Sequence, residues 1–160
     1  MKEKQAIIGI DCGANGAIAV YSEGKVVCHR MPKDVHSLAA ILSTHKDNQI
    51  IFIERVSGWV SDQYIAGKAF GIAKLVKNYN MTINVVAMLN QPWTDITAQT
   101  WQKAYKITQK ETKQQRKLRY KKTAQMYYPD TKVSLWNADA LLILTYARTM
   151  TKLINNLKTK

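Results

Sequence analysis

The chain has 160 residues, 46% hydrophobic and 22% charged, a composition typical of one soluble globular domain. Its 24 Lys and Arg residues outnumber 11 Asp and Glu residues, which gives a net charge of +13. This charge favours a polyanionic partner, and nucleic acid is favoured over an anionic membrane surface. No apolar run is long enough to span a bilayer or to serve as a signal peptide, and the two cysteines make neither a disulfide framework nor a metal spacing, which favours a reducing, cytoplasmic compartment.

The first residues of the chain predict short β-strands joined by tight turns. The β-branched run 6–10 is followed by a glycine-containing turn. The segments 17–21 and 25–30 then flank Ser22-Glu23-Gly24, which is a hairpin signal. We expect these three strands to form a meander.

The middle of the chain alternates predicted helices and strands. Apolar residues at helical spacing predict helices over 35–45 and 61–80, and short apolar runs predict strands over 49–53 and 82–88. A meander followed by βαβα units predicts an α/β fold, with a mixed five-stranded sheet flanked by helices.

The last third of the chain predicts helices only. One is expected from Ile96 onward, a second over 111–128 before Pro129, and a third that Ser134 caps and that runs to about Leu157. Since little of the sequence resembles a linker, we expect the whole chain, residues 1–160, to form a single domain.

Positive charge is concentrated in the C-terminal part of the chain. Residues 101–160 contain 14 basic and 3 acidic side chains, against 10 and 8 in residues 1–100. A solvated helix face usually mixes both signs, and a membrane-bound helix needs large apolar residues, so this excess favours a phosphate-binding surface. The candidate DNA-binding residues here are Lys103, Lys106, Lys110, Lys113, Arg116, Lys117 and Arg119.

Three carboxylates stand at positions that favour a functional role. Asp11 and Glu54 end apolar strands, and if these strands are parallel neighbours both acids emerge at the same sheet edge. Asp139 lies on an apolar helix face, where a carboxylate needs a compensating partner. Taken singly, Asp11 could cap a turn, Glu54 could pair with Arg55, and Asp139 could accept one buried hydrogen bond. Together they predict a Mg²⁺ site, with Mn²⁺ as a substitute, for phosphodiester cleavage.

Four sequence blocks resemble RuvC-type Holliday junction resolvases of the ribonuclease-H-like superfamily, and they look most like its short phage branch. The blocks are Ile8–Gly13, Ile53–Val56, Gly67–Ala73 and Ala138–Leu141. The resemblance covers about residues 6 to 150. It implies a ribonuclease-H-like fold and a homodimer that binds four-way DNA junctions. Such a dimer nicks two strands symmetrically, leaves 5′-phosphates, and would act in the cytoplasm of a bacterial host cell if it is phage-encoded.

The resemblance also implies roles for individual residues. Asp11, Glu54 and Asp139 match the family's metal-binding acids, which makes them the candidate catalytic residues together with Lys103, close to a family lysine at the scissile phosphate. A second family lysine maps within 113–117, where Arg116 and Lys117 fit best. Gly67 and Gly71 share one face of a helix that resembles the family's dimer helix, so the candidate interface residues are Gly67, Phe70, Gly71 and Lys74.

Two positions depart from the family pattern. Trp136 stands where the family usually carries another acid, three residues before the match of Asp139. Ser57 stands where bacterial members carry an aromatic wedge, and Trp59 could either take over that DNA contact by stacking on a base or anchor a loop. Looser discrimination among four-way junctions, three-way junctions and forks is therefore expected. The alternatives are a related nuclease for forks, flaps or RNA–DNA hybrids, and a non-catalytic junction-binding protein.

Overall fold

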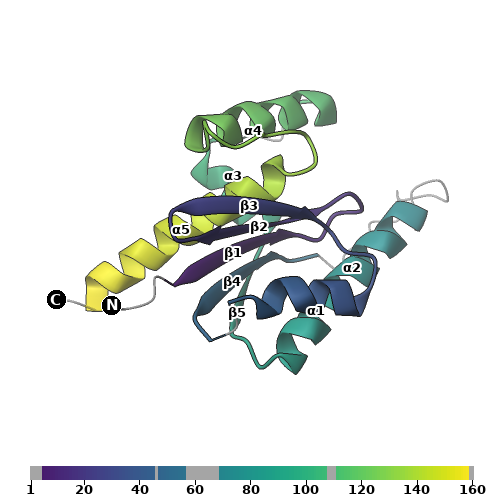
Figure 1. Ribbon diagram of the computed structural model, residues 1–160. Helices are drawn as coiled ribbons and strands as arrows, with labels where there is room; N and C mark the ends of the chain where they lie inside the picture. Colours follow the sequence, from purple (N-terminus) through teal and green to yellow (C-terminus); the bar gives the residue numbers. More distant parts are fainter. Residues whose placement is uncertain (1–4, 46, 57–68, 108–110, 159–160) are drawn as a thin grey trace.

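A computed structural model describes residues 5–45, 47–56, 69–107 and 111–158, and a five-stranded sheet forms its centre (Figure 1). The strands are β1 (Ala6–Asp11), β2 (Ala17–Ser22), β3 (Lys25–Arg30), β4 (Gln49–Glu54) and β5 (Trp93–Ile96). They are arranged in the order β3-β2-β1-β4-β5. Strands β1, β2 and β3 form the predicted meander, while β4 and β5 run parallel to β1, so the predicted mixed sheet of five strands is confirmed.

Helices cover both faces of this sheet. They are α1 (Val35–Ser43), α2 (Ala69–Met88), α3 (Ala98–Ala104), α4 (Lys113–Tyr127) and α5 (Ala138–Lys158). Central strand β1 alternates between two cores, with Ile7 packed on the side of α3, α4 and α5, and with Ile8 and Ile10 packed on the side of α1 and α2 (Figure 1). Of the described helices, none is long and apolar enough to cross a membrane.

The strand predicted over 82–88 is wrong, because helix α2 continues through these residues to Met88. Asn78, Thr82, Val85 and Val86 are buried at helical spacing, and the Thr82 hydroxyl donates to the carbonyl of Asn78 within the helix. Tertiary packing therefore outweighs the strand preference of the β-branched residues here. The fifth strand is β5 instead, a four-residue strand whose first three residues are exposed, which leaves little apolar pattern to detect.

The C-terminal helices are confirmed, but all three begin later than predicted. Ile96 ends β5, and Thr97 caps α3 by accepting the N–H of Thr100. Helix α5 begins at Ala138, so Ser134 is too far away to act as its side-chain cap; the backbone N–H and hydroxyl of Ser134 donate to Asn137 instead. Helix α4 lies within the predicted range and has a capping box between Thr112 and Gln115.

Helix α5 packs directly on the backbone of β1 at Gly9. A Cβ atom at this position would lie 2.5 Å from the backbone nitrogen of Leu144 and 2.8 Å from the carbonyl oxygen of Ala140. Only glycine therefore allows this close approach. The contact fixes the N-terminal turns of α5 against the strand that ends at Asp11.

Candidate active site

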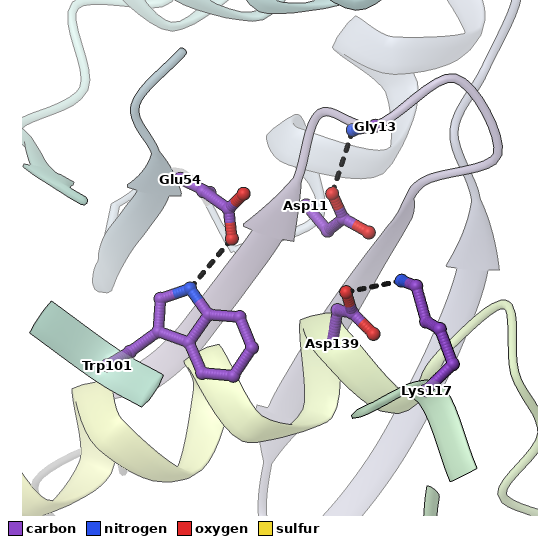
Figure 2. Close-up of polar contacts among 6 residues, drawn as sticks. All are labelled: Asp11, Gly13, Glu54, Trp101, Lys117 and Asp139. Atoms are coloured by element: carbon purple, nitrogen blue, oxygen red, sulfur yellow. Dashed lines mark hydrogen bonds and ion pairs between the residues drawn. The ribbon is translucent and has the colours of Figure 1, made fainter. Parts of the chain in front are cut away.

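Two strand-end carboxylates lie side by side at one edge of the sheet. Asp11 is the last residue of β1 and Glu54 the last of β4, and the predicted parallel pairing of these strands is confirmed. Both side chains belong to the face covered by α5, since residues alternate along a strand and both Gly9 and Phe52 contact that side. Figure 2 shows both carboxylates near the start of α5.

Asp139 comes from the first turn of α5 and is buried at 9% exposure. Its Oδ2 accepts a 2.6 Å bond from the Nζ of Lys117, on α4 (Figure 2). Its Oδ1 is buried and has no hydrogen-bond partner. One oxygen of the site is therefore compensated by a lysine, and another is left available to a further cation or donor.

Asp11 and Glu54 are each held by one neutral donor. The backbone N–H of Gly13 donates to Asp11 Oδ1 at 2.8 Å, which is the turn cap considered from the sequence. The indole Nε1 of Trp101 donates to Glu54 Oε2 at 2.7 Å (Figure 2). Among the described residues Glu54 has no ion pair with Arg55.

Trp101 is the residue of this site that sequence reasoning missed. It lies on α3, is fully buried, and packs edge-on against Tyr120 with ring centres 5.4 Å apart. A buried indole needs an acceptor for its N–H, and in this fold that acceptor is Glu54. From the sequence, a tryptophan in a helix is interpreted as a core residue. Only the need of its buried N–H for an acceptor could have pointed to the acid site.

Burial and mutual repulsion make these carboxylates unusually basic. Burial, assisted by the charge of Asp139, raises the pKa of Asp11 to about 6. Burial, assisted by Asp11, raises the pKa of Glu54 to about 8. Burial also raises the pKa of Asp139, although Lys117 opposes this. Burial acts to lower the pKa of Lys117, but Asp139 and the other two acids raise it overall. The site therefore favours bound positive charge.

The oxygen-only donor set and the unpaired Asp139 Oδ1 fit a hard divalent cation. As they stand, no three His, Cys, Asp or Glu side chains among the described residues converge closely enough to hold a metal ion. The cation at the site is the ammonium of Lys117. A metal ion here would use the unpaired Oδ1 of Asp139, while the ammonium of Lys117 stays on Oδ2.

No carboxylate replaces the family acid at position 136. The ring of Trp136 is half-buried against the core, and the guanidinium of Arg30 lies 4.6 Å from its centre. Asn137, the next residue, accepts from the backbone of Ser134 and donates to the carbonyl of Lys132. Its amide is therefore engaged in holding the turn before α5.

Among the described residues, the other basic candidates form no ion pair with the three acids. Lys103 is exposed on α3, two residues beyond Trp101. Arg119 forms an ion pair with Glu111. Lys106 and Lys113 are exposed, while Arg116 is half-buried on α4 beside Lys117. Of Arg116 and Lys117, the two candidates for the second family lysine, Lys117 is therefore the one that forms an ion pair with an acid of the site, Asp139.

Three of the predicted residues, Trp59, Gly67 and Lys110, lie outside the described residues. The rest of the predicted interface lies on the first turns of α2, where Phe70, Gly71 and Lys74 are all exposed. No described residue lies within 4 Å of a Cβ atom built on Gly71. The part of the chain that the structure describes therefore leaves this face of α2 uncovered.

Comparison with solved structures identifies the fold. No family model matches the sequence, and no curated protein matches it either. A RuvC structure from T. thermophilus in complex with a Holliday junction substrate matches with a TM-score of 0.57 at 13% identity, covering 91% of this chain and 96% of that one. The chain has the RuvC fold. A second Thermus thermophilus RuvC structure matches with a TM-score of 0.53 at 14% identity, covering 92% and 98%. The expected ribonuclease-H-like architecture is thus confirmed.

Proposed function

We propose that this protein is a Mg²⁺-dependent endonuclease that cuts branched DNA, with Holliday junctions as its main substrate. The observation that carries the proposal is the cluster of Asp11, Glu54 and Asp139 beside Lys117, at one sheet edge of a RuvC fold. The net charge of +13 supports a nucleic-acid substrate. One RuvC structure with this fold is bound to a Holliday junction. Paired symmetric nicks with 5′-phosphate ends, and membership of the phage branch, are parts of this proposal that rest on the sequence blocks.

The mechanism assigns each group of the site a role. Asp11, Glu54 and Asp139 would hold Mg²⁺, with Mn²⁺ as a substitute. When bound, the metal lowers the pKa of a water molecule and stabilises the leaving oxygen of the phosphodiester. Trp101 donates to one oxygen of Glu54 and so orients this carboxylate before any metal binds. Lys117, beside Asp139, would hold the negative charge of the scissile phosphate.

The direct test uses labelled four-way, three-way, forked and linear DNA with the whole protein. We expect cutting of four-way junctions in Mg²⁺ and Mn²⁺ and none in EDTA, with three-way junctions and forks cut at comparable rates because Ser57 replaces the aromatic wedge. Comparable cutting of linear DNA, or of RNA–DNA hybrids in preference to junctions, would contradict the proposal.

A non-catalytic junction-binding protein is the second candidate, and Trp136 favours it. Because a tryptophan replaces one acid of the family and Lys117 already neutralises Asp139, DNA binding without metal-dependent cutting is chemically reasonable. Binding of four-way junctions that is equal in Mg²⁺ and EDTA, with no cutting in either, would select this candidate.

Replacing Trp101 with Phe is expected to weaken Mn²⁺ binding by about 10-fold, in the range found when a hydrogen-bond partner of a metal ligand is lost. Phe fills most of the buried volume but cannot donate to Glu54. The measurement is isothermal titration with Mn²⁺, and Trp93→Phe, on the exposed part of β5, is the matched control. Unchanged Mn²⁺ affinity in Trp101→Phe would show that Trp101 does not contribute to metal binding.

We further propose that the protein is a homodimer through the face of α2 that carries Phe70, Gly71 and Lys74. Symmetric nicking of a two-fold junction needs two identical sites, and a two-fold interface uses the same patch twice. Phe70 is 83% exposed in the single chain, which is typical of a covered position in an assembly.

Gly71→Leu is expected to convert the dimer to a monomer, because the added side chain blocks close approach of the second α2. Since no described residue lies within 4 Å of a Cβ atom at Gly71, the larger side chain is expected to leave the fold intact. Size-exclusion chromatography with light scattering gives the oligomeric state, and circular dichroism checks that the melting temperature is kept. A dimer that persists in Gly71→Leu would place the interface elsewhere.

A further inference from the structure

Tyr120 is a buried aromatic residue of α4 to which the mechanism proposed above gives no role. It is 4% exposed and lies three residues after Lys117, on the same face of the helix. The residues of α4 are all described and nearly all polar, and besides Tyr120 the helix buries only the small side chain of Ala124. The rotation of α4 against α5 therefore depends largely on where the Tyr120 ring is seated.

The ring of Tyr120 contacts the hydrogen-bond donors of two different acids. Its centre lies 5.4 Å from that of Trp101 at an interplanar angle of 63°, an edge-on geometry that aromatic pairs prefer. The Nζ of Lys117 lies 5.7 Å from the same ring centre, within the distance at which an ammonium is attracted to an aromatic ring. Trp101 donates to Glu54, and Lys117 donates to Asp139 (Figure 2).

Tyr120 therefore connects two carboxylates that repel each other and belong to different elements. Glu54 ends β4, whereas Asp139 lies in the first turn of α5. The connection consists of successive contacts, from Glu54 to Trp101, from Trp101 to Tyr120, from Tyr120 to Lys117 and from Lys117 to Asp139. Because side chains in a close-packed interior have little freedom to move, the ring limits the positions that both donors can take.

We propose that Tyr120 is a positioning residue that sets the spacing of Glu54 and Asp139 before any metal or DNA binds. It acts through Trp101 and Lys117 rather than on the reacting atoms. Groups that are ordered in advance lose less freedom when the ion and the phosphate arrive, so binding and reaction are both favoured. The consequence for DNA cutting rests on the proposed function, whereas the consequence for Trp101 concerns the chain alone.

The first test follows the indole N–H of Trp101 by NMR in the metal-free protein without DNA. Its signal is identified by its absence in Trp101→Phe, and its exchange in deuterated water reports how firmly it is held on Glu54. Tyr120→Leu removes the ring and is expected to speed this exchange by about 10-fold, whereas Tyr120→Phe keeps the ring and should stay within about twofold of the unmutated protein. Tyr120→Met, which also lacks a ring, replaces Tyr120→Leu if the latter does not fold.

Tyr128→Leu is the matched control for lost stability. Tyr128 is also buried, at 5% exposure, directly after the last residue of α4, and its hydroxyl accepts a hydrogen bond from Thr145. Its replacement should lower the melting temperature at least as much as Tyr120→Leu, because a hydrogen-bond partner is lost with the ring. Well below melting, the Trp101 indole of this control should exchange within about twofold of the unmutated rate. Equal acceleration in both variants, or none in Tyr120→Leu, would overturn the proposal.

The second test measures cutting and binding of a labelled four-way junction by the same variants. Tyr120→Leu is expected to cut about 10-fold more slowly in a single turnover, and Tyr120→Phe should restore the rate. Junction affinity in Ca²⁺ should stay within about twofold, because the phosphate contacts are kept. A merely structural role would lower binding and cutting alike through the loss of folded protein, and that result, or normal cutting by Tyr120→Leu, would overturn the proposal. If no version of the protein cuts junctions, the proposed function is rejected, and the indole exchange alone decides whether Tyr120 positions Trp101.

Discussion

Asp11→Asn, Glu54→Gln and Asp139→Asn are each expected to lower the rate of junction cutting by about 1,000-fold, because each variant removes a carboxylate proposed to hold a metal worth several kcal/mol to the reaction. Junction binding is expected to stay within about threefold of the unmutated protein, since the phosphate contacts belong to the basic side chains. Single-turnover cutting of a labelled four-way junction and gel-shift binding in Ca²⁺ separate the two effects. Cutting by Asp139→Asn at the unmutated rate would show that the metal assignment is wrong.

Asp11→Asn is also expected to stabilise the metal-free fold at neutral pH. The folded-state pKa of Asp11, about 6, lies above its ordinary value of 3.8, so folding favours the protonated form. The stability that this group contributes is present below pH 4 and is lost as the pH rises through 6. Asp11→Asn should therefore melt at the same temperature as the unmutated protein at pH 4 and several degrees higher at pH 8 in EDTA. Saturating Mg²⁺ should narrow the difference at pH 8 by stabilising the unmutated protein.

The arrangement of Asp11 and Glu54 could be predicted because it depends on strand direction alone. An acid at the end of an apolar strand lies at the edge of the sheet where that strand ends. A helical connection allows the two strands to run parallel, so that both acids lie at the same edge. Asp139 followed from a carboxylate on an otherwise apolar helical stripe. These features arise from local pattern and sheet topology, which a single sequence contains.

The partners of the acids could not be predicted in this way. The choice between Arg116 and Lys117 depends on how α4 is rotated about its axis against α5, because neighbouring residues of a helix point about 100° apart. Helix α4 is nearly all polar, so its sequence pattern does not determine which face packs on α5. Helix α3 begins at Ala98, after β5 has ended at Ile96, and this start sets the direction in which Trp101 points toward Glu54. Likewise, the predicted strand over 82–88 failed because β-branched residues on α2 are buried by α1 and the sheet. Each of these outcomes depends on tertiary contacts between distant segments.

The contact between Gly9 and α5 connects the stability of the fold to the geometry of the site. Ala140, whose carbonyl oxygen lies against Gly9, is the residue next to Asp139. The position of the Asp139 carboxylate relative to Asp11 is therefore set by a backbone contact one turn into α5. A substitution that moves the first turn of α5 away from β1 should therefore slow DNA cutting, even though it removes no functional group.

Gly9→Ala is expected to destabilise the protein by about 2–3 kcal/mol and lower its melting temperature by roughly 5–10 °C, because the new Cβ overpacks against backbone that has no freedom to rotate away. The start of α5 must shift outward, since the 2.5 Å approach to Leu144 is shorter than any ordinary van der Waals contact. A displacement of about 1 Å at Asp139 is expected to slow cutting by about 100-fold below the melting temperature. Asn84→Ala is the control: this side chain is exposed on α2, so the melting temperature should stay unchanged or rise slightly. If Gly9→Ala melted and cut like the unmutated protein, α5 would not be held against β1 at this point, and the placement of Asp139 would need another cause.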